Sequence, residues 1–481
     1  MHWKYMASLL GLLLLFIGLS MLFPLIFSLY FNDSGLVPLF WSANIVIIAG
    51  LLLHLSFRKN TAQGISHREG IFIVALAWTA TGIAGSLPYI LGGFMSITDA
   101  VFESFSGFTT TGASVLNNIE ALPPGMLMWR SFTHWLGGMG IIVLSLAVLP
   151  LIGVGGMQLY KAEVSGPSPD KLKPRISETA MLLWKVYLLF TVILAGLLLL
   201  GGLDLMDSLC QTFGTVATGG FSNKNASIAH FASPYVEWVI TLFMFLCAVS
   251  FALHYKVLTG KIRDAWKSPE LRFFTAVILV FISLSAASVY WHEQVSFEQA
   301  LRLSAFQVVS IISSTGFVTY DYLLWPGLVQ IIILLCMFIG GCAGSTAGGI
   351  KCIRIVLMLK LAYREIFRII HPHAVRPVKL GKTLVKEEVL SSVVGFILMY
   401  ILLMGLASLF VAASGVDFTT SVTSVLACIS NIGPGFGHVG PASSFAHLPL
   451  AAKWILTLCM LLGRLEIFTI IVLMTPDFWK K

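Results

Sequence analysis

The feature of this sequence that most constrains its fold is a short glycine-containing motif that occurs four times at similar spacing. The copies lie at residues 108–114 (Phe-Thr-Thr-Thr-Gly-Ala-Ser), 216–221 (Val-Ala-Thr-Gly-Gly-Phe), 313–318 (Ser-Ser-Thr-Gly-Phe-Val) and 430–435 (Ser-Asn-Ile-Gly-Pro-Gly), centred on Gly112, Gly219, Gly316 and Gly433. Each copy follows a short, mildly apolar segment and precedes a long apolar one. Four small-residue loops in this setting predict a four-part structure in which the loops surround one ion pathway.

The composition places the chain among membrane proteins. Of its 481 residues, 57% are hydrophobic and only 11% are charged, with a mean hydropathy of +0.90, whereas soluble domains carry about 25% charged residues. The net charge of +8 does not point to nucleic acid, because basic cytoplasmic loops give membrane proteins positive charge. The seven cysteines lie mostly in apolar runs without ligand spacing, so we expect neither a disulfide framework nor a zinc site.

The apolar runs predict an all-α polytopic membrane protein with two N-terminal spans (residues 5–31 and 37–55) and four similar units. We divide the chain at residues 1–69, 70–160, 161–265, 266–386 and 387–481. Each unit has an outer span (70–91, 179–200, 273–290, 389–413), a short pore segment (97–108, 205–215, 297–312, 418–429), a loop and an inner span (129–151, 236–258, 328 onward, 448–473). A pore segment of about 12 residues is only about 18 Å long as a helix and cannot cross a core of about 30 Å. It must therefore enter the membrane and return, which predicts pseudo-four-fold symmetry around one pore.

The placement of basic residues supports this count of spans. With both termini inside, 24 of the 30 Lys and Arg residues fall in cytoplasmic segments, as the positive-inside rule requires. If one pore segment crossed the membrane completely, every later loop would change sides and this bias would disappear. The four loops should therefore open toward the outside.

The loop chemistry suits a cation. A potassium-type filter replaces the hydration shell of the ion with backbone carbonyls, and glycine adopts the required backbone angles at little cost. The C-terminal ends of the four short helices would add partial negative charge near the pore. The alternative is that the motifs are ordinary turns, but four copies at matching places favour a filter. The candidate filter residues are Thr110, Thr111, Gly112, Ala217, Thr218, Gly219, Ser314, Thr315, Gly316, Asn431, Ile432 and Gly433.

The third inner span is interrupted by a glycine-rich segment, residues 340–349. Five glycines in ten residues destabilise a helix by about 5 kcal/mol relative to alanine, so a loop near mid-membrane is expected. The alternative is an intact, closely packed helix, because Gly340, Gly344 and Gly348 form a small-residue face. The candidate gate residues are Gly340, Gly341, Gly344, Ser345, Thr346, Ala347, Gly348, Gly349 and Arg464.

Arg464 lies in the last apolar span, where a charge is expected to face protein or a water-filled cavity. We expect it to face the pore and to pair with carbonyls of the gate or the loops. An ion pair with Glu466 is the alternative, but helical periodicity places the two side chains on different faces. Glu103, Gln211 and Gln307 lie eight or nine residues before the motif glycines, and we expect them to brace the pore helices.

These motifs make the chain similar to the Trk/Ktr/HKT superfamily of potassium transporters, and most similar to its bacterial Trk-type membrane subunits. The resemblance covers residues 70–477, and the two extra N-terminal spans resemble the Trk branch. It implies K⁺ as the transported ion, because Gly112 stands where sodium-selective plant relatives carry serine. It implies no tightly bound cofactor. It further implies an intramembrane gate at residues 340–349, a homodimer, a cytosolic RCK-type nucleotide-binding (TrkA-like) regulatory subunit, and a bacterial inner membrane location.

Three alternatives accompany this reading. Asn431, Ile432 and Gly433 depart most from a potassium-channel signature, so a Na⁺-permeable or an H⁺- or Na⁺-coupled symporter is the runner-up. An intramembrane enzyme would need a nucleophile with a histidine or carboxylate partner, and Ser345 has no mid-membrane histidine, so we do not expect an enzyme. The basic segment at residues 351–386 suits either anionic lipid or the regulatory subunit.

Overall fold

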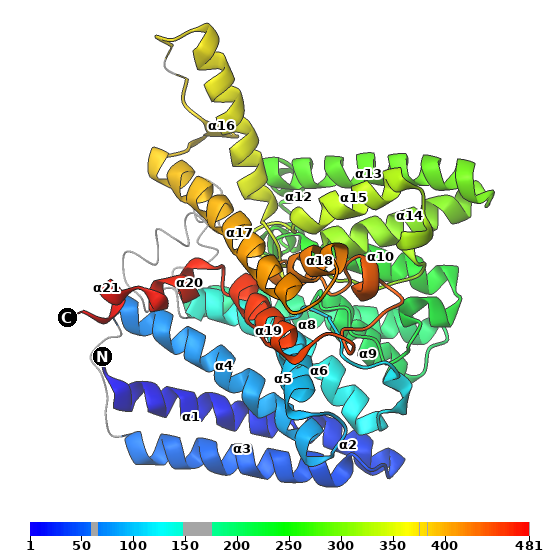
Figure 1. Cartoon of the computed structure of the whole chain (residues 1–481), viewed down its shortest axis with the longest axis vertical. Coiled ribbons are helices and arrows are strands. Elements are labelled where there is room, and N and C mark those ends of the chain that lie inside the picture. Colours follow the sequence, from blue (N-terminus) through cyan, green and yellow to red (C-terminus); the bar gives the residue numbers. More distant parts are fainter. Residues whose placement is uncertain (59–65, 148–175, 375, 382, 481) are drawn as a thin grey trace.

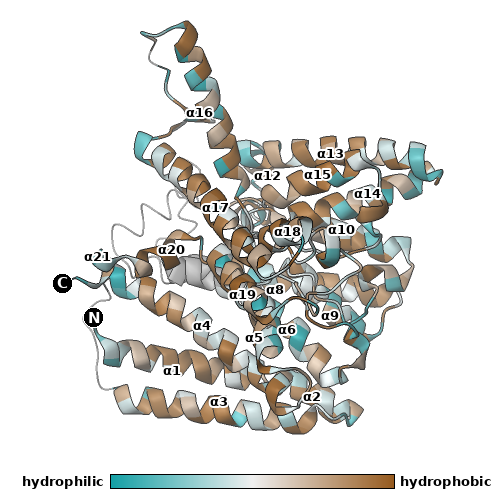
Figure 2. Cartoon of the chain, viewed as in Figure 1, coloured by the Kyte–Doolittle hydropathy of each residue, from teal (hydrophilic) through white to brown (hydrophobic). Residues whose placement is uncertain are grey.

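The computed structural model describes residues 1–58, 66–147, 176–374, 376–381 and 383–480, and these residues are predominantly helical. Within them, six helical segments are long and apolar enough to cross a membrane, or eight if each of two bent helix pairs counts as one span. Most lie roughly parallel in Figure 1 and carry apolar residues along their length in Figure 2. The chain is therefore a multi-pass membrane protein, as the composition predicts.

The N-terminal spans form an antiparallel pair. Helices α1 (Trp3–Ser20) and α2 (Leu22–Phe31) make one apolar run, and α3 (Leu36–Phe57) packs along α1. The backbones approach closely because Gly11 faces Gly50. A Cβ atom built on Gly50 would lie 2.8 Å from the Gly11 carbonyl oxygen. Both spans agree with those expected from the sequence.

The order of long helix, short helix, loop and helix then recurs along the chain. The first unit has α4 (His67–Leu91), α5 (Ile97–Phe108) and α6 (Pro124–Ala147), and the second has α8 (Ile176–Leu200), α9 (Leu205–Val216), α10 (Pro234–Ala248) and α11 (Phe251–Leu258). The third has α13 (Pro269–Glu293), α14 (Phe297–Ile312), α15 (Gly327–Phe338) and α16 (Cys352–Ile370). The fourth has α17 (Glu387–Ala413), α18 (Phe418–Ile429), α19 (Leu450–Arg464) and α20 (Phe468–Ile471). Short elements connect them: η1 (Ile119–Ala121), η2 (Ser227–Phe231), α12 (Ile262–Trp266), η3 (Tyr322–Leu324), β1 (Lys379–Leu380), β2 (Thr383–Leu384), η4 (Gly437–Val439), η5 (Val472–Met474) and α21 (Pro476–Trp479).

The four short helices begin at capping residues. Ser96, Asp204, Ser296 and Asp417 each accept a hydrogen bond from the backbone three residues later. Such caps satisfy donors that the first helical turn leaves free, and they explain why these helices start where the sequence predicts. Three of the four have the predicted bounds, and α9 ends one residue later, at Val216.

Two inner spans expected to be continuous are bent. Residues 236–258 were predicted as one span, but α10 and α11 meet at 103°, and α19 and α20 meet at 110° within the predicted span 448–473. The first bend frees backbone groups that bond to the glycine-rich segment. The Cys342 N–H donates to the Ala248 carbonyl at 2.8 Å, and the Phe251 N–H donates to the Gly344 carbonyl at 3.0 Å. The end of the predicted span 129–151 lies outside the described residues.

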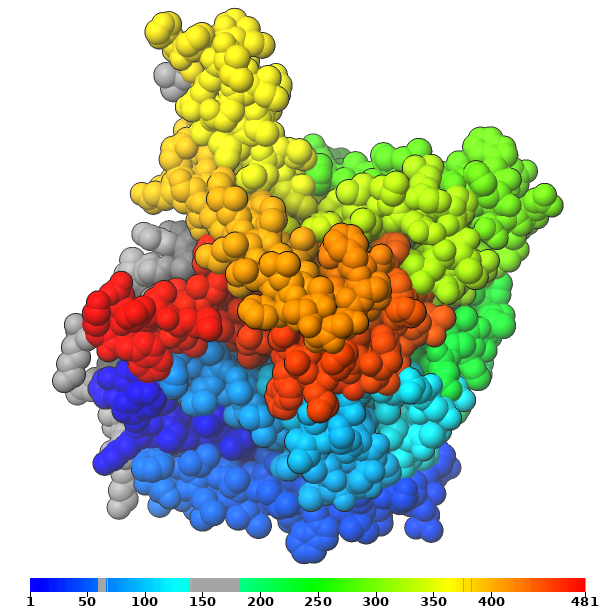
Figure 3. Space-filling model, in the orientation of Figure 1, coloured from blue at the N-terminus to red at the C-terminus, as the bar shows by residue number. Residues whose placement is uncertain are grey.

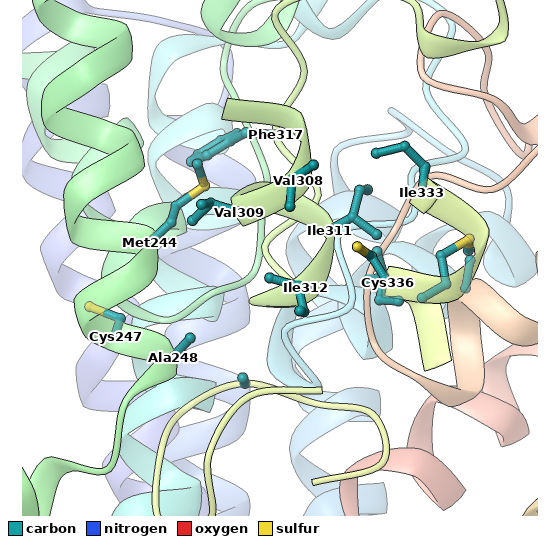
Figure 4. Packing of buried hydrophobic residues seen from close by; sticks show 14 of the residues in the cluster. Met244, Cys247, Ala248, Val308, Val309, Ile311, Ile312, Phe317, Ile333 and Cys336 are labelled. Carbon is teal, nitrogen blue, oxygen red and sulfur yellow. The ribbon is translucent and has the colours of Figure 1, made fainter. Parts of the chain in front are cut away.

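Apolar packing joins these helices around the short ones. Figure 4 shows Met244 and Cys247 of α10, Val309 and Ile312 of α14, and Cys336 of α15 within one buried cluster. In the space-filling view of Figure 3, α16 and the turn after it stand out from the compact body as a yellow arm. Both termini lie on the same side of the body in Figure 1. Residues of the short helices thus belong to the buried core, and the ends of these helices position the loops that follow.

Candidate functional site

The four motif loops leave their short helices with the same backbone conformation. The first residue of each has a left-handed φ of 53° to 56° (Thr110, Thr218, Ser314, Asn431), and the glycine two residues later has a φ of 80° to 99° (Gly112, Gly220, Gly316, Gly433). The N–H of the residue between them donates to a carbonyl of the short helix at 2.8 or 2.9 Å in every loop (Thr111 to Ser106, Gly219 to Gly214, Thr315 to Ser310, Ile432 to Ala427). The four loops are therefore equivalent residue by residue.

This equivalence corrects the predicted register of the second loop. The sequence predicts a loop centred on Gly219 that includes Ala217, but Gly220 has the left-handed conformation of Gly112, Gly316 and Gly433. Ala217 instead caps the C-terminal end of α9. Two adjacent glycines made both registers acceptable in the sequence, and the hydrogen bond from Gly219 to the short helix decides between them.

The loops meet in a closed ring. A Cβ atom built on Gly112 would collide with the Gly219 carbonyl oxygen, one on Gly220 with that of Thr315, and one on Gly316 with that of Ile432. The ring closes because a Cβ on Gly433 would lie 2.9 Å from the Thr111 carbonyl oxygen. Glycine is required at these positions for two reasons: the left-handed φ and the close approach of the neighbouring backbone.

The predicted bracing residues hold the chain that follows each loop. The buried Glu103 carboxylate accepts from the Ser114 hydroxyl and the Val115 N–H, both at 2.9 Å. It also pairs with the buried Arg130 at 2.6 Å, and Arg130 donates to the Ser222 carbonyl of the second loop at 2.7 Å. Loops one and two are thereby connected through a buried ion pair.

The second and third loops use an amide at the position of Glu103. Gln211 donates to the Ser222 and Asn223 side chains at 2.9 Å, and Gln307 donates to the Tyr320 carbonyl at 3.1 Å. In the fourth unit the aligned residue is Ser424, and the adjacent Thr423 holds the chain instead: its hydroxyl accepts from the Phe436 N–H at 3.0 Å. The role of Thr423 could not be predicted from the sequence, because a threonine on an apolar helix carries no distinctive signal.

One face of the ring opens into a cavity of about 440 Å³ that is lined by Gly112, Gly220, Gly316 and Gly433. Asn117, Lys224, His438 and His447 also line it. Among the described residues of the lining, none is Asp or Glu. The cavity therefore contacts all four loops without supplying a carboxylate ligand.

The glycine-rich segment lies against the opposite side of the ring and is not helical between α15 and α16. The Gly348 N–H donates to the Ser314 hydroxyl at 2.6 Å, and the Thr346 hydroxyl donates to the Val216 carbonyl at 3.2 Å. A Cβ atom on Gly348 would collide with the Ser430 carbonyl. The segment therefore contacts the start of three of the four loops, and the alternative of an intact helix is wrong.

Arg464, at the end of α19, connects this segment to α6. Arg464 is 3% exposed, and its guanidinium donates to the Thr346 carbonyl at 2.9 Å and to the Gly137 carbonyl of α6 at 3.3 Å. It is the last residue of α19, so Glu466 does not share its helix and instead pairs with Arg354. The remaining predicted gate residues, Gly340, Gly341, Gly344, Ser345, Ala347 and Gly349, all lie in the same non-helical segment.

Comparison with known proteins gives matches along the whole chain. The profile of the family described as "TrkH: Cation transport protein" matches residues 40–481. The chain is 42% identical to the Trk system potassium uptake protein TrkH of Halomonas elongata and 40% identical to that of Escherichia coli K12, with all of both chains covered. The crystal structure of the potassium transporter TrkH from Vibrio parahaemolyticus superposes with a TM-score of 0.91 at 36% identity, again over the full length of both chains.

Proposed function

Because the chain belongs to the TrkH family of cation transport proteins, in agreement with the resemblance stated above, we propose that it takes up potassium through the ring of four loops. The observation that carries this proposal is the closed contact of Gly112, Gly220, Gly316 and Gly433 with the neighbouring carbonyls. The four units then act as quasi-equivalent quarters around one pore, and the division into residues 1–69, 70–160, 161–265, 266–386 and 387–481 remains part of the proposal.

In this mechanism, backbone carbonyls replace the water around K⁺. The ion-binding residues are those of the three aligned positions in each loop: Thr110, Thr111 and Gly112; Thr218, Gly219 and Gly220; Ser314, Thr315 and Gly316; and Asn431, Ile432 and Gly433. The four short helices end directly before the loops, so their C-terminal partial charges favour a cation there.

One side-chain oxygen at the first aligned position supplements the carbonyls. Thr110 Oγ1 is buried and has no hydrogen-bond partner among the described residues, whereas the Asn431 amide packs against α19 and donates to the Met460 carbonyl. A buried polar atom without a partner destabilises the protein by about 1–3 kcal/mol, so a passing cation is a suitable partner for the Thr110 oxygen. At the second position Thr111 and Thr315 each carry a hydroxyl, whereas Gly219 has no side chain and Ile432 has a hydrocarbon one, so the ring is chemically asymmetric.

The glycine-rich segment acts as the gate in this proposal. It contacts the loops on the side opposite the cavity, and Arg464 fixes its Thr346 carbonyl. A positive side chain beside the pathway adds an electrostatic barrier to cations. Opening then requires the segment to leave the ring and Arg464 to lose this bond.

The assembly and location belong to the same proposal. We place the chain in a bacterial inner membrane with both termini in the cytoplasm, as a homodimer with an RCK-type nucleotide-binding regulatory subunit. The joint location of the termini and the distribution of basic residues support this orientation. The chain is a transporter rather than an enzyme, and the Ser345 hydroxyl donates to the Cys342 carbonyl at 2.6 Å.

A Na⁺-permeable or ion-coupled symporter is the second candidate, and the asymmetry at Ile432 is the observation that favours it. Purified protein in liposomes would be tested under opposed K⁺, Na⁺ and pH gradients. A reversal potential that follows K⁺ alone supports the proposal. A potential that follows Na⁺ equally, or that shifts with the pH gradient, supports the second candidate.

A further inference from the structure

The glycine-rich segment has an anchor outside the ring, and this anchor is a carboxylate. Glu270 lies in the first turn of α13 and is 8% exposed. Its Oε1 atom accepts from the Ala343 N–H at 2.8 Å and from the Ile353 N–H at 3.1 Å. One oxygen therefore holds both the glycine-rich segment and the beginning of α16.

The Ile353 bond explains why an acceptor oxygen is needed there. The first N–H groups of a helix have no partner within the helix, and the N-cap of α16, Lys351, provides no side-chain cap. A negative charge at a helix N-terminus is also stabilising. Glu270 thus caps α16 from another helix, more than 80 residues away in the sequence.

The glycine-rich segment is bonded to α13 and to α11, and residues 259–268 connect these two helices. On one side, Glu270 lies two residues after Ser268, the N-cap of α13. Arg272 of the same helical turn donates to the Trp266 carbonyl of α12 at 2.7 Å. On the other side, the Phe251 N–H at the start of α11 holds the Gly344 carbonyl at 3.0 Å. Helix α11 packs against α12, so residues 259–268 join both anchors.

We propose that Glu270 is a positioning residue for the gate, whose carboxylate holds the glycine-rich segment against the ring and makes its position depend on the connector of residues 259–268. The inference rests on the proposed function, because it needs the segment to control flux. A displacement of α12 moves the first turn of α13 and the start of α11 at the same time. The segment, bonded to both, then moves away from the loops.

The test measures K⁺ flux per folded protein in liposomes without any regulatory subunit. Glu270→Ala removes the acceptor of two buried bonds, and we expect basal flux to rise about tenfold, the order expected when two such bonds bias a two-state element. Glu270→Gln keeps an acceptor oxygen and should remain near the wild type. The ratio of K⁺ to Na⁺ permeability should not change in either variant, because the ring is untouched.

A matched control and a connector variant complete the design. Glu237→Gln alters another buried carboxylate, which pairs with Arg302 far from the segment, and should leave basal flux unchanged. Two glycines inserted after Gly260 should raise flux in the wild type but add nothing in Glu270→Ala. Additive effects, or a loss of ion selectivity in Glu270→Ala, would overturn the inference.

The outcomes also separate this inference from the proposed function. If Arg464→Gln raises basal flux and Glu270→Ala does not, the gate stands and the role of Glu270 is wrong. If neither variant changes flux, the segment is not a gate, and both the gate proposal and the role of Glu270 are wrong. If the wild type carries no K⁺ at all, the transport proposal itself fails.

Discussion

Replacing Gly220 by alanine tests the ring and its register together. Gly220 has a φ of 80°, and a Cβ atom there would collide with the Thr315 carbonyl of the third loop. The left-handed conformation alone costs a non-glycine residue about 1–2 kcal/mol, which lowers the population of the intact ring about 5- to 30-fold. The displaced Thr315 carbonyl adds to this effect, so we expect loss of selectivity for K⁺ over Na⁺ rather than loss of insertion.

Two other glycines serve as controls for this experiment. Gly202 has a φ of 89° with nothing within 4 Å of a built Cβ atom, so Gly202→Ala carries the same backbone strain without touching the ring. Gly219 does not have a left-handed φ, and the three atoms nearest to a Cβ built on it belong to the His134 ring rather than to backbone, so Gly219→Ala should be milder than Gly220→Ala. Reversal potentials of the purified variants in liposomes under a K⁺ and Na⁺ gradient, with melting temperatures measured in parallel, provide the comparison. Unchanged selectivity in a well-inserted Gly220→Ala variant would refute the reasoning.

Three further variants probe the supporting contacts. Arg464→Met removes the bond to the Thr346 carbonyl, and basal ⁸⁶Rb⁺ flux should rise; flux at the wild-type level would argue against the gate. Glu103→Gln leaves Arg130 buried without a counter-charge, which destabilises a protein by about 3–5 kcal/mol, so the melting temperature should fall clearly, and an unchanged value would contradict the brace. Gly50→Leu places a side chain between α1 and α3 and should lower stability by about 1–3 kcal/mol while flux per folded protein stays constant.

The short helices and most of the loop positions could be predicted from the sequence because their signals are local. Ser96, Asp204, Ser296 and Asp417 are strong helix caps, and a glycine with a left-handed φ lies four residues after the end of each helix. The interruption at residues 340–349 is also favoured locally, because five glycines in ten residues destabilise a helix, although the small-residue face of Gly340, Gly344 and Gly348 left an intact helix as the alternative. These features depend on neighbouring residues and so survive without knowledge of the tertiary structure.

The features that escaped prediction depend on contacts between distant segments. The bend after Ala248 occurs at Val249 and Ser250, without glycine or proline, because the backbone there bonds to residues 342 and 344. The bend after Arg464 likewise falls at Leu465–Ile467, where local propensity favours helix. In the second loop, Gly219 and Gly220 are interchangeable by composition, and only the hydrogen bond to α9 fixes the register.

The mutual support of the four glycines has a consequence for biosynthesis. Residue 112 rests against residue 219, and so on around to residue 433, which returns to residue 111. A chain that ends before the fourth unit lacks residues 432 and 433, so the contacts of Gly316 and of Thr111 with the fourth loop cannot form. If the ring is the proposed filter, it can therefore close only after the last unit has been synthesised.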